Sequence, residues 1–430
     1  MKKTRRMLAL VIAMLIILTG CISAFAEEDV TLTILTRYSG SDPHTPWLEW
    51  CIEEFTKEHP NVTIQNESIA DEAAYNNKLK TCIASGNIPD QWMMYGAATV
   101  VEYAKNGLVM DISDWKNDEV WVSGFLDPEL STYNLSGYGV DGIYGLSIAM
   151  VPEIIYYNVD LFEKAGIEKV PETLSELYEA IEKLKAIDVT PISMGASDTW
   201  RLGHFFDCLV YRMCGIDKIK DIGARNAKWT DPEVIEALKE LKNFKDVGAF
   251  EPNFEGVDWS MESAGFLAGK YAMCVVPTWF IATIENSDTE QNIAFFEFPY
   301  DEDHPEYADN AAVFSDGQLF SNKVEGYKRE VLTEWGKFIS SAKAESARIR
   351  IARGMPGRTD IEVDVSAMSD MQVKGIELTK NLTRFAGDTF DFDMLNSMQD
   401  VTRNNLVGMM LGMSPEDTAA AIQAEIDNYA

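Results

Sequence analysis

Acidic residues and histidines are the side chains of this sequence that could carry out acid–base or metal chemistry. It contains 69 Asp and Glu residues but only four histidines, which are scattered without the spacing of metal ligands: His44, His59, His204 and His304. The G-x-S-x-G, Walker A and H-E-x-x-H motifs are all absent. Two well-placed carboxylates suffice for glycoside hydrolysis, so this enzyme class is the hardest to exclude. We predict no catalytic residue, no metal site and no cofactor.

The elements that would position a site alternate between strand and helix in the first part of the chain. Residues 31–36 (TLTILT) alternate like a half-buried strand, and residues 61–65 (NVTIQ) form a second strand after an intervening helix. This order indicates parallel pairing. A helix that ends at Gly86 and a strand over residues 91–96 repeat the pattern. Because 430 residues are too many for one ordinary core, we expect two domains, the first an open α/β domain.

A second group of elements begins at residues 142–158, GIYGLSIAMVPEIIYYN. This segment reads as two short apolar runs that are broken by Pro152 and have no helical period. Further along, Thr173 with Glu176 three residues later predicts a capping box at the start of a helix. Another helix is predicted between Asp231 as N-cap and Gly248 as C-cap.

The N-terminus predicts export from the cytoplasm. Four basic residues precede an apolar run, residues 7–18, that is too short to span a bilayer comfortably. Residues 18–21, LTGC, resemble a bacterial lipobox, in which the cysteine, here Cys21, becomes lipidated. The alternative is cleavage after Ala26 at the A-x-A site of residues 24–26, which would release a secreted protein. We assign residues 1–20 to a signal peptide and expect the mature chain outside the cytoplasm.

The charge and the cysteines exclude further classes. The formal net charge is −32, and such a field repels phosphate backbones and anionic lipid head groups, so nucleic-acid or membrane-surface binding is not expected. A solvated acidic surface explains this charge. The cysteines after Cys21 have no C-x-x-C spacing, which argues against a disulfide framework and zinc and favours buried apolar roles: Cys51, Cys82, Cys208, Cys214 and Cys274.

Several segments, taken in their order and spacing, resemble the extracellular solute-binding proteins of bacterial ABC transporters, specifically the large family that binds carbohydrates. The segments are the lipobox, LTILT with HPNVTI, IASGNIPDQWMM, NGLVMDISDW, YYNVDLFEKAGI with PETLSEL, WTDPEVIEALKELKNF, AGFLAGKYAMCVVPTWF and GMPGR. They extend from residue 18 to residue 358, so the resemblance covers nearly the whole chain.

The resemblance implies a periplasmic-binding-protein type II fold, in which two open α/β lobes with discontinuous chain segments are joined by a hinge. Residues 147–153 would lie near the hinge, and Tyr156, Tyr157 and Asn158 would begin the second lobe. We expect core and hinge packing for these tyrosines, with ligand contact as the alternative. The ligand would be enclosed between the lobes, where strands of open α/β sheets end. The implied boundaries are 29–148 and 314–350 for the first lobe, and 149–313 and 351–430 for the second.

A carbohydrate site needs aromatic platforms for the C–H faces of the sugar and polar groups for its hydroxyls. Trp200 lies in a polar loop and Trp279 follows a strand-like run, so each is a candidate platform, with core packing as the alternative. Polar candidates lie in predicted loops or strand ends, where an ordinary loop role is the alternative. They are Tyr38, Ser39, Asp42, Tyr95, Asp316, Gly317 and Arg358, the last with a surface role as its alternative.

The sequence therefore predicts a monomeric, lipid-anchored receptor that captures a sugar or oligosaccharide by hinge closure and delivers it to the permease subunits of an ABC importer. A glycoside hydrolase is one alternative. A binding protein for a peptide or cationic ligand is another, because the acidic balance gives it mild support, whereas the ten tryptophans favour carbohydrate.

Overall fold

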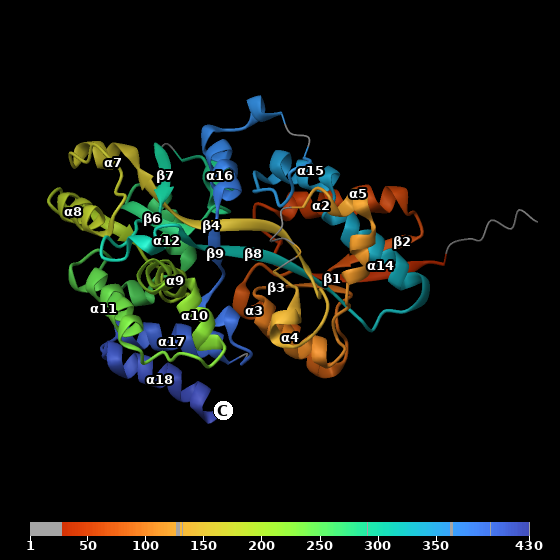
Figure 1. Ribbon diagram of the computed structural model, residues 1–430. Helices are drawn as coiled ribbons and strands as arrows, with labels where there is room; N and C mark the ends of the chain where they lie inside the picture. Colours follow the sequence, from red (N-terminus) through yellow and green to blue (C-terminus); the bar gives the residue numbers. More distant parts are fainter. Residues whose placement is uncertain are drawn as a thin grey trace, which may run out of the picture.

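The structure is a computed structural model that describes residues 28–125, 130, 132–289, 291–361, 364–395 and 397–429. Two bodies of helices and strands lie side by side and are bridged by two long strands, β4 (Leu146–Asn158) and β8 (Asn310–Phe320) (Figure 1). We call the body that contains the first strand the first lobe and the other the second lobe. The predicted signal peptide, Cys21 and the A-x-A site lie outside the described residues.

The first lobe is built on a parallel sheet of β1 (Val30–Leu35), β2 (Val62–Asn66) and β3 (Gln91–Met94). β1 lies between β2 and β3 and is parallel to both, with Val30 opposite Val62. The strand–helix–strand unit predicted from the sequence is thereby confirmed. Helices pack around this sheet: α2 (Thr45–Glu58), α3 (Glu72–Ser85), α4 (Ala97–Lys105), α5 (Glu119–Val122), α14 (Gly326–Ile339) and α15 (Ala342–Ala352).

The second lobe contains β5 (Thr190–Ser193), β6 (Tyr271–Pro277) and β7 (Ile293–Glu297), together with the end of β4. β5 and β6 are parallel, whereas β4 is antiparallel to both β6 and β7. β9 (Arg384–Ala386) pairs with the start of β8. The helices of this lobe are α7 (Val159–Lys164), α8 (Leu174–Lys185), α9 (Trp200–Cys214), α10 (Ile216–Gly223), α11 (Pro232–Asp246), α12 (Trp259–Leu267), α13 (Phe280–Glu285), α16 (Asp370–Asn381), α17 (Met398–Met410) and α18 (Pro415–Asn428).

Strand β4 joins the two apolar runs that the sequence separates at Pro152 into one continuous strand. Up to Pro152 the strand pairs with β8, and from Glu153 it pairs with β6. Pro152 therefore lies where β4 changes neighbours, a place where the missing amide proton disturbs the ladder little. The register between β4 and β8 shifts between Ser147 and Met150, inside the segment predicted to be near the hinge.

The buried apolar side chains form one large cluster in each lobe. The cluster of the first lobe takes its members from residues 30–148 and 319–352, and that of the second lobe from residues 149–314 and 386–426. A smaller third cluster contains Tyr156, Phe280 and Met355. Tyr156 is fully buried, so the packing role that we expected for this tyrosine is confirmed.

Some of the helix caps predicted from the sequence are present in the structure, and others are not. Gly86 and Gly248 have positive φ angles after α3 and α11, as C-terminal glycines should. Thr173 accepts the amide of Glu176, but the Glu176 carboxylate accepts the amide of Glu172, so the reciprocal capping box is not formed. Asp231 is the N-cap of α11, although its carboxylate binds Lys218 and the amide of Lys228 instead of capping the helix. The ammonium group of Lys218 thus binds the carboxylate that was expected to cap the helix.

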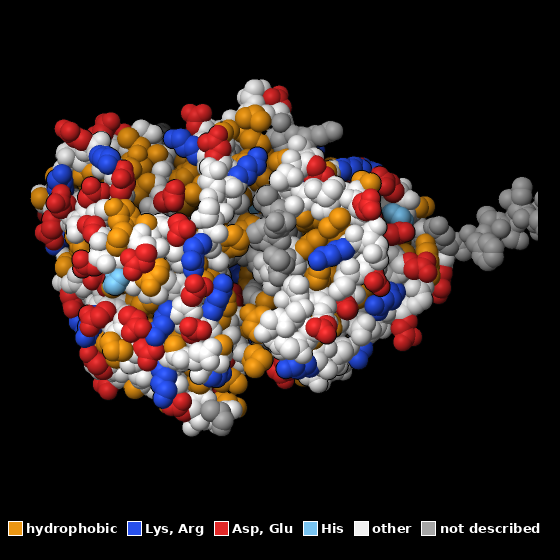
Figure 2. Space-filling model, in the orientation of Figure 1, with side chains coloured by type: hydrophobic (Ala, Val, Ile, Leu, Met, Phe, Trp, Pro, Cys, Tyr) orange, Lys and Arg blue, Asp and Glu red, His pale blue; other side chains and the backbone are white. Residues whose placement is uncertain are grey.

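The visible face carries Asp and Glu side chains that are spread over the surface, most densely on the second lobe (Figure 2). This dispersion fits a solvated acidic surface.

Short 3₁₀ helices complete the lobes: η1 (Ser113–Asn117), η2 (Leu135–Tyr138), η3 (Phe254–Gly256), η4 (Pro305–Tyr307), η5 (Val365–Ala367) and η6 (Thr389–Phe392). In the part of the chain that the structure describes, no helix has the length and apolar character needed to cross a membrane.

Candidate functional site

Three half-buried tryptophans, Trp200, Trp259 and Trp279, lie together in the second lobe and are called here the tryptophan group. Trp200 begins α9 after β5, and Trp279 follows the end of β6, so both lie beyond the carboxyl ends of strands. The ring centroids of Trp259 are 5.7 Å from those of Trp200 and 5.4 Å from those of Trp279. The structure thus brings together the two tryptophans that the sequence predicted, 6.4 Å apart, and adds a third.

The Arg201 side chain packs against two rings of the tryptophan group. Its guanidinium lies 4.9 Å from the Trp200 ring and 5.0 Å from the Trp259 ring. The side chain is fully buried and donates to both carboxylate oxygens of Glu262, at 2.9 and 2.8 Å, and to the carbonyl of Val275. Burial lowers the pKa of Arg201, but Glu262, together with Cys274 and Glu153, raises it, so that the pKa is above its usual value. Arg201 therefore stays charged and fixes two of the three indole rings.

His204 and Glu153 form a buried polar pair beside the tryptophan group. The His204 ring stacks on Phe314, 3.7 Å away, and lies 5.0 Å from the Trp200 ring. Burial holds the pKa of His204 well below its usual value, with further lowering by Arg403 and Arg201, and burial raises the pKa of Glu153. A protonated Glu153 can donate to Nδ1 of His204, 3.3 Å from its Oε2.

Polar groups of the first lobe gather near the crossing strands. The Tyr38 hydroxyl donates to Asp316 Oδ2 at 2.7 Å. Burial lowers the pKa of Arg37, but Tyr95, Glu72 and Asp42 raise it by more, so these groups lie close to one another. Burial also raises the pKa of Tyr95, and Asp316 adds to this effect. Four polar residues predicted from the sequence, Tyr38, Asp42, Tyr95 and Asp316, thus belong to one neighbourhood.

Charged residues beside these two groups of side chains connect the lobes. Glu72 of α3 lies 3.6 Å from Arg403 of α17 in the second lobe. Burial raises the pKa of Asp198, two residues before Trp200, and Glu72 contributes to this shift from the opposite lobe. The tryptophan group of the second lobe and the polar groups of the first lobe therefore both lie close to the contacts between the lobes.

Three of the predicted residues have other roles in the structure. Arg358 is buried, which makes its surface alternative wrong, and it donates to the carbonyls of Trp121 and Ser340. Gly317 is buried in β8, where a Cβ would lie 1.8 Å from the Tyr133 hydroxyl, so close packing requires glycine. Ser39 is half-buried, and its carbonyl accepts the amide of Asp42 in a turn. The guanidinium of Arg358 and the space beside the Cα of Gly317 are thus both occupied by protein contacts.

The sequence reasoning missed Trp259, Arg201, Glu72 and Arg403. Trp259 had a usable signal, because it follows Asp258, the N-cap of α12, and so starts a helix as Trp200 does. No local sequence pattern pointed to Arg201, Glu72 or Arg403. Arg403 and Glu72 are far apart in the chain, and only the fold places them together.

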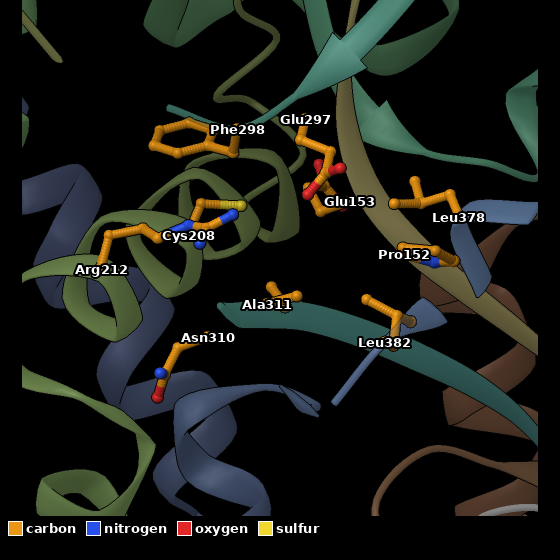
Figure 3. A pocket seen from close by; sticks show the side chains of 11 residues that line it. Pro152, Glu153, Cys208, Arg212, Glu297, Phe298, Asn310, Ala311, Leu378 and Leu382 are labelled. Atoms are coloured by element: carbon orange, nitrogen blue, oxygen red, sulfur yellow. The ribbon is translucent and has the colours of Figure 1, made fainter. Parts of the chain in front are cut away.

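Two hollows in the second lobe do not reach the tryptophan group. The first, lined by Glu153, Cys208 and Arg212 among others, has a volume of about 10 Å³, which is about one water molecule (Figure 3). The second is an open groove of about 570 Å³ beside Phe295, Tyr300 and Leu378. Neither is lined by a member of the tryptophan group.

Acidic residues, histidines and cysteines give no sign of a metal centre in the described ranges, where no group of three or more is placed to hold an ion. Two of the buried carboxylates bind protein groups: Asp388 binds Arg403 at 3.1 Å, and Asp207 accepts the amide of Thr389 at 3.0 Å. The five described cysteines are free thiols, and four of them are buried, as expected for small apolar residues.

Two α/β lobes, with an aromatic group in one and polar groups in the other close to the contacts between the lobes, define a two-lobed ligand-binding protein. The chain belongs to the family of bacterial extracellular solute-binding proteins, whose model matches residues 40–343. The resemblance noted in the sequence is thereby confirmed.

Individual relatives agree with this family. The chain is 22% identical to the diacetylchitobiose-binding protein DasA of Streptomyces coelicolor over 416 residues, which is 94% of this chain and 90% of the relative. It is 32% identical to a putative binding protein of Brucella abortus over 271 residues, 63% of each chain. A solved chitin oligosaccharide binding protein has the same fold, with a TM-score of 0.83 and 24% identity over 93% of this chain and 98% of that one.

Proposed function

We propose that this protein captures a sugar or oligosaccharide outside the cytoplasm and delivers it to an ABC importer, without chemistry of its own. The observation that carries the proposal is that the tryptophan group of the second lobe and the polar groups of the first lobe both lie close to the contacts between the lobes. Indole rings cover the C–H faces of a pyranose, and the hydroxyl and carboxylate groups of the first lobe can bind its hydroxyls. Of the residues named from the sequence, the proposed ligand contacts are Tyr38, Ser39, Asp42, Tyr95, Asp316, Trp200 and Trp279.

The relatives support the same class of ligand. Their names include a diacetylchitobiose-binding protein and a xylose/arabinose-binding protein, and a structural neighbour with a TM-score of 0.74 is in complex with cycloalternan. The proposed partners are the permease subunits of the importer, and the proposed state is a monomer. The proposed lobe boundaries are residues 29–148 with 314–350 and residues 149–313 with 351–430.

A thermal-shift screen across mono- and oligosaccharides tests the ligand class. A ligand at 100 times its dissociation constant adds about 2.7 kcal/mol of stability, so a true ligand raises the melting temperature clearly. Shifts with amino acids, peptides or polyamines and none with saccharides would contradict the proposal.

A glycoside hydrolase remains the second candidate, and a long incubation separates it from a receptor. The bound sugar should be recovered unchanged from a receptor. Shorter products that disappear when one Asp or Glu is replaced would favour the hydrolase.

Trp200→Ala and Trp279→Ala are each expected to weaken saccharide binding by about ten- to a hundredfold. Loss of one platform returns apolar area to water, which costs on the order of 1–3 kcal/mol at about 25 cal/mol per Å². Titration calorimetry measures the affinity, and thermal melting of the ligand-free protein measures stability, which should change little.

Trp229 provides the matched control in the same lobe. It is 1% exposed and lies in the apolar core, so Trp229→Ala should cost about 3–5 kcal/mol of stability through the cavity it leaves. If Trp200→Ala behaves like this control and leaves affinity unchanged, Trp200 is a core residue.

Lipid anchoring through Cys21 is proposed from the LTGC segment directly after the apolar run. Cys21→Ala should release the protein from the membrane fraction or leave the precursor unprocessed, as fractionation and mass spectrometry would show. A wild-type mature chain that begins at Glu27 without lipid would establish the alternative cleavage after Ala26.

A further inference from the structure

Glu72 lies between two arginines that belong to different lobes. Its Oε2 is 3.7 Å from Nη1 of Arg37 in the first lobe, and its Oε1 is 3.6 Å from Nη1 of Arg403 in the second. Each arginine is held by its own lobe: Arg37 donates to the carbonyl of Ala70 at 2.9 and 2.7 Å, and Arg403 donates to Asp388 at 3.1 Å. The two cations therefore approach the same carboxylate from fixed positions.

Other contacts show that the lobes touch next to this carboxylate. The Tyr138 hydroxyl of the first lobe donates to the carbonyl of Asp391 in the second, at 3.2 Å. A Cβ on Gly96 of the first lobe would lie 1.9 Å from Oδ1 of Asp391. Glu72 thus lies on a seam where the lobes are in direct contact, and a motion that separates them breaks its bond to Arg403.

We infer that Glu72 is a positioning residue for ligand capture, because its carboxylate holds Arg403 across the seam when the lobes are closed. This inference rests on the proposed function. It assigns to the Glu72–Arg403 contact the role of slowing ligand release. Without the carboxylate, Arg403 loses its attraction to the first lobe, which favours the open arrangement. The Glu72 side chain is 27% exposed and that of Arg403 is 9% exposed, so salt can screen the contact.

The test compares Glu72→Gln with Glu67→Gln. Glu67 is the matched control, because its ion pair with Lys78, at 2.7 Å, lies within the first lobe. With a saccharide found in the screen, Glu72→Gln should raise the Kd about three- to tenfold through faster dissociation, with little change in the association rate. The difference from wild type should disappear at about 1 M salt, where the screening length falls to about 3 Å. Glu67→Gln should change none of these quantities.

Two results would overturn the inference: an unchanged dissociation rate for Glu72→Gln, or an effect of equal size at high salt. Failure of the carbohydrate assignment is a separate outcome. If no saccharide binds the wild type, spin labels on the two lobes of the ligand-free protein decide the question. A closed population that Glu72→Gln reduces supports the role of Glu72. The absence of such a population, or one that the substitution leaves unchanged, contradicts it.

Discussion

Arg201→Met is expected to lower the free energy of unfolding by about 3–5 kcal/mol, because it leaves the buried carboxylate of Glu262 without its partner. Glu262 is fully buried and keeps only weaker contacts, among them the Ser193 hydroxyl at 2.9 Å. Loss of the guanidinium also removes the support beneath Trp200 and Trp259. Ligand affinity should therefore fall together with stability. Urea denaturation measures the first effect and titration calorimetry the second.

Arg384→Met is the control for the same chemical change at an exposed ion pair. Arg384 binds Asp217 at 2.7 Å, and both side chains are exposed to solvent, so this substitution should leave unfolding and binding nearly unchanged. If Arg201→Met unfolds at the same urea concentration as Arg384→Met, the buried pair contributes nothing to stability. Lost stability with unaltered affinity would show that the tryptophan group does not depend on Arg201.

Arg348→Met is expected to have an effect of similar size, about 3–5 kcal/mol, because the buried Arg348 side chain holds together the two bridging strands, β4 and β8, and the segment after α15. Its Nη1 donates to the carbonyl of Ile148 in β4 and, at 3.4 Å, to that of Met355 after α15. Its Nη2 lies 3.4 Å from Asp316 in β8. The loss should loosen the hinge as well as the fold. Denaturant unfolding gives the stability, and small-angle scattering gives the spread of lobe arrangements.

The stability gap between wild type and Arg348→Met should also widen as the pH rises above about 7. Burial raises the pKa of Glu345 to about 7, although Arg348 lowers it, and the two side chains are 3.9 Å apart. A raised folded pKa means that stability is present at low pH and is lost as the pH rises through that value. Without Arg348, the pKa of Glu345 in the folded protein is higher still. The variant therefore continues to lose stability above about pH 7, where the stability of the wild type no longer changes through this group. A gap that stays constant between pH 6 and pH 9 would show that Glu345 does not depend on Arg348.

Local patterns in the sequence were sufficient for the fold class and for much of the first lobe. The alternation of TLTILT and the helix that ends at Gly86 report which faces are buried, and the structure shows the parallel strands that they predict. The sequence pattern did not predict that β4 continues through Pro152. Whether a strand tolerates proline depends on whether a neighbouring strand needs its amide proton at that position. The neighbours of a strand are a tertiary property.

For the site, the sequence by itself determined which side chains were available, and the tertiary structure decided which of them meet. Trp200 and Trp279 could be named because polar neighbours or a preceding strand-like run are visible locally. The polar loop predicted around Trp200 is wrong, however, because Trp200 begins helix α9. Arg358, equally visible, turned inward to the carbonyls of Trp121 and Ser340. The contact of Glu72 with Arg403 had no local signal, because an ion pair between residues distant in the chain depends on how two lobes pack and leaves no periodic pattern in either segment.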